Sequence, residues 1–213
     1  INIDSYYNEL TTSRIGVVNS GRNGLNTTAL NLKEGFIDSV KANGGYYIAR
    51  YEASYGIDKK ANSKVSNTFI DTDGTAPTKE GELWNNVNQI SAATASRELY
   101  STATTDLINS YAWDTAIVFI QKCGTESNSL TYSYTLGGSS TSTSEPQTTG
   151  TNILKATSKV DKQCNIFDMA GNCREWTTET CSSSYNPCIN RGASYDYSGN
   201  HTSNRYSYTT SYA

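Results

Sequence analysis

The chain has 213 residues and a formal net charge of −3, from 17 lysines and arginines against 20 acidic residues. Since it contains no run of basic residues, it offers no positively charged surface to a phosphate backbone, which excludes nucleic acid as the expected partner. Asn, Ser and Thr account for 76 residues and Tyr for another 16. These uncharged polar groups and hydroxyl-bearing rings favour a recognition surface over an apolar catalytic pocket.

We also expect no membrane insertion, because no stretch approaches the roughly 20 apolar residues that span a bilayer. The chain starts at Ile1 without the features of a secretory signal, so we expect a soluble piece of a longer protein. Its Ser/Thr/Asn-rich surface favours an extracellular location.

The predicted domain follows a short N-terminal part. Residues 1–35 contain Gly/Asn turns and short patterned pieces, and we expect them to pack on the domain, which covers residues 36–213. Within it, Gly44-Gly45 precedes the aromatic run Tyr46–Glu52. A turn followed by such residues predicts a strand.

The middle of the chain predicts two helices, over about 89–100 and 107–121. In the second, Trp113, Ile117 and Ile120 recur on one helical face. The candidate caps are Asn88 or Ser91 for the first helix and Asn109 or Ser110 for the second.

The last third of the chain has no helical period. Residues 124–160 are rich in Ser, Thr and Gly and predict a long hairpin or loop. From Asn165 onward, short aromatic-bearing segments favour short strands. Two helices with strands before and after them predict an α+β domain rather than alternating βαβ units.

The five cysteines cannot all pair with one another. Cys181 and Cys188 enclose a short polar turn and are the predicted disulfide. Cys164 and Cys173 are the candidates for a second one, which leaves Cys123 over. The spacings match no zinc pattern, and the chain has a single histidine.

The most specific motif is N-I-F-D-M-A-G-N-C-R-E-W-T at 165–177, followed by R-G-A-S at 191–194. It resembles the formylglycine-generating-enzyme family, or sulfatase-modifying-factor domain, whose signature reads N-x-x-D-M-x-G-N-x-x-E-W-T and then R-G-G-S. The resemblance covers about residues 36–200. It implies a variant C-type lectin fold, with two helices, short antiparallel strands and much irregular structure, and a ligand face built from the C-terminal segment.

The same motif holds candidate calcium ligands, since its carboxylates and carbonyls can supply oxygen atoms. In family members that bind calcium, a side chain at the Asp168 position, the carbonyls at the Gly171 and Cys173 positions and the Glu175 carboxylate do so. In the alternative interpretation, Asp168 caps a turn and Glu175 pairs with an arginine such as Arg191. We expect no required cofactor, with structural calcium as the candidate ion.

The family's two known chemistries lack their ligands here. Family enzymes that oxidise sulfatase cysteines hold copper with two cysteines just after R-G-G-S, whereas residues 195–208 contain none. The iron-dependent sulfoxide-synthase relatives need several histidines, and His201 has no evident partner for general-base chemistry. We therefore predict a protein that is not an enzyme. The alternative is an enzyme relative of this family with a different active site.

Between residues 195 and 212, Tyr alternates with small polar residues, as in antibody binding loops. The segment also resembles the variable region of proteins diversified by diversity-generating retroelements, which rewrite adenines in Asn codons. Such proteins present variable side chains on a C-type lectin scaffold at a phage tail tip or bacterial cell surface. The resemblance implies a variable region of about 191–213 on a scaffold fixed by Trp84, Trp113 and Trp176.

The expected partner is a protein or glycan on a target cell surface. The candidate solvent-facing contacts are Tyr195, Asp196, Tyr197, Asn200, His201, Thr202, Asn204, Tyr206, Tyr208 and Tyr212. A calcium-dependent lectin is a further alternative, because Glu145-Pro146-Gln147 is close to a sugar-binding Glu-Pro-Asn triplet. We interpret this match as chance, since it lies in the Ser/Thr-rich loop.

Overall fold

A computed structural model describes residues 33–56, 60–63, 80–127, 129–134, 162–181, 183–194 and 201–210, together with the backbone at 153–154 and 159–160. This part of the chain is mixed α+β with antiparallel sheets, as predicted. Most of the predicted N-terminal segment and most of the 124–160 loop lie outside it. None of the described helices is long and apolar enough to cross a membrane.

The described helices are α2 (Lys33–Asn43), α3 (Gln89–Arg97), α4 (Ser110–Cys123) and the short 3-10 helix η3 (Ser129–Tyr134). Helices α3 and α4 confirm the two predicted helices, and both begin where the sequence indicated. The side chain of Asn88 accepts the N–H of Ser91, and that of Asn109 accepts the N–H of Ala112. Helix α2 and η3 were not predicted.

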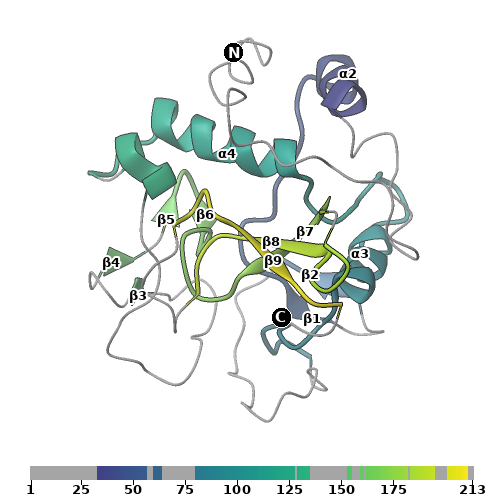
Figure 1. Cartoon of the computed structure of the whole chain (residues 1–213). Coiled ribbons are helices and arrows are strands. Elements are labelled where there is room, and N and C mark those ends of the chain that lie inside the picture. Colours follow the sequence, from purple (N-terminus) through teal and green to yellow (C-terminus); the bar gives the residue numbers. More distant parts are fainter. Residues whose placement is uncertain are drawn as a thin grey trace.

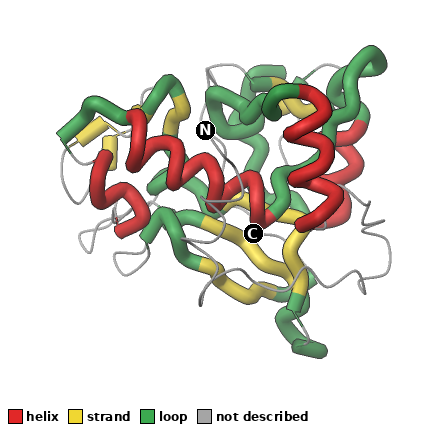
Figure 2. Tube along the Cα trace, turned by 90° about the horizontal axis from the view of Figure 1, so that it is seen from above, coloured by secondary structure: helices red, strands yellow, loops and turns green. Residues whose placement is uncertain are grey.

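The strands form small antiparallel sheets (Figure 1). The pairs are β1 (Ser54–Tyr55) with β2 (Ala61–Asn62), β3 (Ile153–Leu154) with β4 (Lys159–Val160), and β5 (Lys162–Gln163) with β6 (Ile166–Phe167). The three-stranded sheet has the order β7 (Glu175–Thr180), β8 (Cys188–Arg191), β9 (Arg205–Tyr208). Helix α4 crosses over this sheet, and Figure 2 shows the same arrangement turned by 90°.

The strand predicted over 46–52 is wrong, because these residues are irregular and the first strand begins at Ser54. The aromatic character of the run has another cause. The Tyr46 ring packs edge-on against Phe36 of α2 at 5.2 Å, and its hydroxyl donates to the carbonyl of Ala112 in α4 at 2.7 Å. Tyr46 thus joins two helices instead of a sheet.

The core lies beneath α4. Trp113, Ile117 and Ile120 face inward, as their spacing predicted, and pack with Tyr132 of η3 and Met169 of the turn after β6. Of the other tryptophans expected to fix the scaffold, Trp176 is 5% exposed and Trp84 is half-buried. The core therefore joins α4 to the segment that holds the most specific sequence motif.

The predicted disulfides are wrong: all five cysteines lie in the described part of the chain, and none is disulfide-bonded. Thr180, not Cys181, lies opposite Cys188 on the paired strands. The thiol of Cys181, just after β7, instead donates to the carbonyl of Asn186 at 3.1 Å. Cys164 and Cys173 are likewise unbridged.

Candidate functional site

The candidate site is built on β9, whose side chains alternate between the two faces of the sheet. Arg205 lies opposite Arg191 of β8, and Tyr206 lies opposite Asn190. Directly paired residues of antiparallel strands project to the same face. One face therefore carries two arginines beneath α4, and the other carries Tyr206 and Tyr208.

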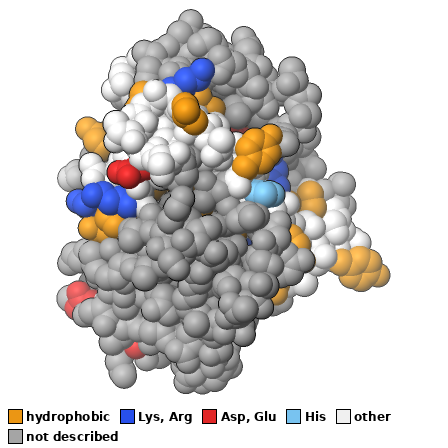
Figure 3. All heavy atoms as spheres, turned by 90° about the vertical axis from the view of Figure 1, so that its left-hand side faces the viewer, with side chains coloured by type: hydrophobic (Ala, Val, Ile, Leu, Met, Phe, Trp, Pro, Cys, Tyr) orange, Lys and Arg blue, Asp and Glu red, His pale blue; other side chains and the backbone are white. Residues whose placement is uncertain are grey.

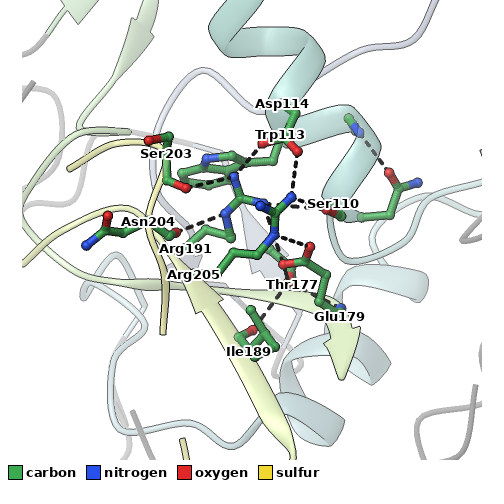
Figure 4. Close-up of polar contacts among 12 residues, drawn as sticks. Ser110, Trp113, Asp114, Thr177, Glu179, Ile189, Arg191, Ser203, Asn204 and Arg205 are labelled. Carbon is green, nitrogen blue, oxygen red and sulfur yellow. Dashed lines mark hydrogen bonds and ion pairs between the residues drawn. The ribbon is translucent and has the colours of Figure 1, made fainter. Parts of the chain in front are cut away.

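Beneath α4, the two arginines share two buried carboxylates (Figure 4). Asp114 of α4 accepts from Arg191 Nη2 at 2.5 Å and from Arg205 Nη2 at 2.7 Å. Glu179 of β7 accepts from Arg205 Nε at 2.8 Å and lies 3.5 Å from Arg191 Nη1. Two positive and two negative groups balance in a site where Arg191 is fully buried. The network joins α4, β7, β8 and β9.

The same network fixes the main chain that leads into β9. Arg191 Nε donates to the carbonyl of Asn204 at 3.0 Å, and the indole N–H of Trp113 donates to the carbonyl of Thr202 at 3.0 Å. Thr202 is fully buried, so our expectation that it faces solvent is wrong. The backbone of Thr202 is held in place by its hydrogen bond to Trp113. Asn204, two residues later, is partly exposed.

His201 contacts η3. Its Nδ1 lies 3.0 Å from the carbonyl oxygen of Tyr134, and the two rings meet edge-on at 6.0 Å. Ser203 binds the same helix, because its N–H and hydroxyl both donate to the carbonyl of Ser133. The described contacts of His201 are thus with a carbonyl and a ring. They do not form the pair of base and nucleophile that general-base catalysis needs.

On the opposite face of the sheet, aromatic rings form a continuous row. Tyr206 is 43% exposed and contacts Tyr208 at 6.2 Å, and Tyr208 meets Trp176 edge-on at 6.2 Å. The guanidinium of Arg174 lies over the Tyr206 ring at 4.6 Å. The indole N–H of Trp176 donates to the carbonyl of Val87, which anchors the row to the scaffold.

Of the predicted contacts, the structure describes His201, Thr202, Asn204, Tyr206 and Tyr208, and it brings Tyr206 and Tyr208 into contact. The remaining ones, Tyr195, Asp196, Tyr197, Asn200 and Tyr212, lie outside the described residues, as does the triplet at 145–147. On the face shown in Figure 3, the described hydrophobic side chains form separate small groups.

Of the predicted calcium ligands, Asp168, Gly171 and Cys173 lie on the turn between β6 and β7, and Glu175 is the first residue of β7. Asp168 is fully buried, and its carbonyl accepts the N–H of Gly171 at 3.0 Å. A Cβ added at Gly192 would lie 3.0 Å from Oε2 of Glu175 and 2.9 Å from the carbonyl oxygen of Met169, so these oxygen atoms crowd one spot. Arg191 forms its ion pairs with Asp114 and Glu179, which excludes the alternative pairing with Glu175.

These donors fit calcium in kind, because Asp168 and Glu175 offer carboxylates and Gly171 and Cys173 offer carbonyls. Within the described residues, no group of three or more His, Cys, Asp or Glu side chains could hold a metal ion. A calcium ion would therefore depend on carbonyls and water for most of its coordination. The calcium site stays a prediction.

Two buried acidic residues were not predicted from the sequence, Glu52 beside the motif and Asp114 in α4. Glu52 is buried and accepts from the side chain of Asn172 and, at 2.9 Å, from the N–H of Cys173, which ties the 45–52 segment to the motif. Asp114 was missed because it lies among apolar residues of α4. An acidic residue within a buried helical face is the signal that could have found it, since a buried charge needs a partner.

No protein-family model matches this chain, and no similar protein was found among curated proteins or among solved structures.

Proposed function

We propose that this chain is a non-enzymatic ligand-binding protein. Its C-terminal segment forms the binding face on a scaffold of the formylglycine-generating-enzyme type of C-type lectin fold. The segment is diversified by a retroelement, and the protein is displayed on a phage particle or bacterial surface, where it binds a protein or glycan of a target cell. The proposal rests on the motif at 165–177 and on the composition of 195–212.

One structural observation carries the proposal furthest: the buried ion pairs that position β9 lie on its inner face, whereas its outer face makes weaker ring contacts. Arg205 is locked into the ion pairs with Asp114 and Glu179, while the neighbouring Tyr206 faces outward and is 43% exposed. Because the strongest side-chain contacts of the strand belong to the inner face, outer side chains can change with little displacement of the backbone. A variable binding surface needs that separation.

A binding experiment tests the proposal through Tyr206. Labelled protein is applied to a panel of bacterial cells, and binding is followed by flow cytometry. We expect Tyr206→Ala to abolish binding to any cell that the parent protein binds, with little change in melting temperature, because the ring is an exposed aromatic anchor. Tyr185→Ala is the matched control, since Tyr185 is 86% exposed and lies in another segment.

Two results would contradict this assignment. One is a Tyr206→Ala protein that loses stability but still binds. The other concerns diversification, which predicts a near-copy of the codons for about 191–213, differing at adenines, beside a reverse transcriptase gene. Sequencing of the neighbouring DNA checks this, and the lack of such a copy would remove the retroelement from the proposal.

A further inference from the structure

Asn190, at the centre of the three-stranded sheet, has a side chain that the fold does not use. It is 1% exposed, and neither its Nδ2 nor its Oδ1 has a hydrogen-bond partner. A buried amide normally finds partners, because burying an unpaired donor or acceptor costs free energy on folding. Asn190 retains an unpaired donor and an unpaired acceptor at a candidate binding face, and a ligand that pairs with both would explain why.

The neighbours of Asn190 place this amide within the aromatic row. Asn190 lies directly opposite Trp176 on one side and Tyr206 on the other, so the three side chains share a face. Tyr208 contacts both aromatic rings. The hydroxyls of Tyr206 and Tyr208 form no hydrogen bond with any described residue. This face therefore combines ring surfaces with one unpaired amide and two available hydroxyls.

The geometry of an amide restricts what can pair with it. On one edge, a side-chain amide presents an N–H donor beside its carbonyl acceptor, so the match for that edge is a group with an acceptor and a donor equally close together. A trans peptide group does not provide this, because its N–H and C=O point in opposite directions. Two hydroxyls on adjacent carbons of a sugar ring do, since each hydroxyl can donate or accept.

We propose that Asn190 is the specificity-determining residue of a site for a neutral sugar with vicinal hydroxyls, a proposal that rests on the binding function assigned to this face. Nδ2 donates to one hydroxyl and Oδ1 accepts from its neighbour. The Tyr206 and Tyr208 rings contact the C–H face of the pyranose, and their hydroxyls bind its rim. No metal takes part, which separates this site from the calcium-dependent sugar binding considered from the sequence.

Because Asn190 is 1% exposed, a sugar reaches its amide only if a neighbouring side chain moves, and Tyr206 at 43% exposed is its more exposed cross-strand partner. Its ring is held by the Arg174 guanidinium at 4.6 Å and by Tyr208 at 6.2 Å, and its hydroxyl is not anchored to a described residue. Both are weak contacts compared with the buried ion pairs that hold Arg205 on the same strand. The ring can therefore change rotamer while the backbone of β9 stays in place.

The test measures binding of methyl glycosides of glucose, galactose and mannose by ligand-observed NMR, with and without EDTA. We expect the protein to bind at least one of them, with a Kd of about 1 mM, as is reasonable for a single small ligand. The matching deoxy glycoside, in which one hydroxyl of the vicinal pair is absent, should bind at least about tenfold more weakly. EDTA should have no effect.

Asn190→Leu separates a ligand-binding role from a structural one. We expect it to reduce sugar affinity at least about tenfold while its melting temperature stays equal or rises, because an apolar side chain of similar size removes two unpaired atoms. Thr115→Val in α4 is the matched control, since Oγ1 of Thr115 is also buried and unpaired. It should leave sugar binding unchanged. Asn190→Ala replaces the leucine variant if that protein does not fold.

The inference is overturned if no glycoside binds, or if the Asn190 variants bind a glycoside as tightly as the parent protein does. It is also overturned if Asn190→Leu folds but has a melting temperature below those of the parent protein and of Thr115→Val. Binding of adenosine without any glycoside would also overturn it, because adenine presents an adjacent donor and acceptor too. Each of these results leaves the proposed function standing as long as Tyr206→Ala abolishes cell binding.

Discussion

Arg205 Nη2 lies 2.7 Å from Oδ2 of Asp114, a residue 91 positions earlier in the chain. The contact attaches the inner side of β9 to the helix that forms the centre of the core. Because Arg205 also bonds Glu179, the strand is fixed at one residue by two carboxylates. The next residue, Tyr206, takes no part in these ion pairs, and its ring is 43% exposed.

Removing one charge from this network should destabilise the protein strongly. Asp114→Asn leaves Arg191 and Arg205 to share only Glu179, and an uncompensated buried charge costs about 3–5 kcal/mol. Urea unfolding measures the loss. Asp106→Asn is the control, since the Arg97–Asp106 pair is 24% and 15% exposed and should contribute less than about 1 kcal/mol. Equal effects of the two substitutions would show that the buried network does not hold β9.

Gly192, between β8 and the C-terminal segment, should not tolerate a side chain. Its φ of +78° is unfavourable for other residues, and an added Cβ would lie 2.9 Å from the carbonyl oxygen of Met169. Gly44→Ala isolates the first effect, because Gly44 has a φ of +74° but open space around it. We expect Gly44→Ala to cost roughly 1–2 kcal/mol, and Gly192→Ala about 1–3 kcal/mol more from the collision. Thermal unfolding of both variants compares them; equal losses would contradict the predicted contact.

The predicted calcium site has a direct thermodynamic readout. If calcium binds the folded chain at Asp168 and Glu175, a hundredfold excess of calcium over Kd adds about 2.7 kcal/mol to the free energy of unfolding. The melting temperature then rises, and EDTA reverses the rise. Asp168→Asn and Glu175→Gln should remove the response. Glu98→Gln, on the far end of α3, should keep it. A melting temperature that does not depend on calcium would exclude the site.

Tyr46 should make the protein sensitive to alkaline pH. Burial, aided by the negative charge of Asp114, raises the pKa of Tyr46 well above its ordinary value of 10. The unfolded chain therefore loses this proton near pH 10 while the folded chain keeps it, so the contribution of Tyr46 to the free energy of unfolding is constant below about pH 10 and falls as the pH rises above it.

Tyr46→Phe tests this dependence. It should cost about 1 kcal/mol at neutral pH, through loss of the hydrogen bond to Ala112. It should also flatten the decline above pH 10, leaving the contributions of Tyr111 and Cys164, whose pKa values burial also raises. Denaturant unfolding at neutral and alkaline pH measures both effects. An unchanged alkaline slope would contradict the role of Tyr46.

Local features of this chain were predictable, and features that depend on distant partners were not. Helices α3 and α4 begin at Asn88 and Asn109 because a cap bonds a backbone N–H only a few residues away. The 46–52 run was misassigned because its aromatic residues satisfy a strand pattern, although Tyr46 makes its contacts 66 residues away. Helix α2 escaped prediction for the same reason, since Phe36 and Ile37 are buried by packing on Ala112 of α4.

The sequence by itself determined the α+β class, the two central helices and the concentration of tyrosine near the C-terminus. It could not determine which side of β9 each residue faces, because strand register is set by pairing with β8. Only the tertiary structure buried Thr202, separated Cys181 from Cys188 and placed the unpaired amide of Asn190 between Trp176 and Tyr206. These outcomes depend on groups brought together across the fold, where burial decides the free energy of each polar atom.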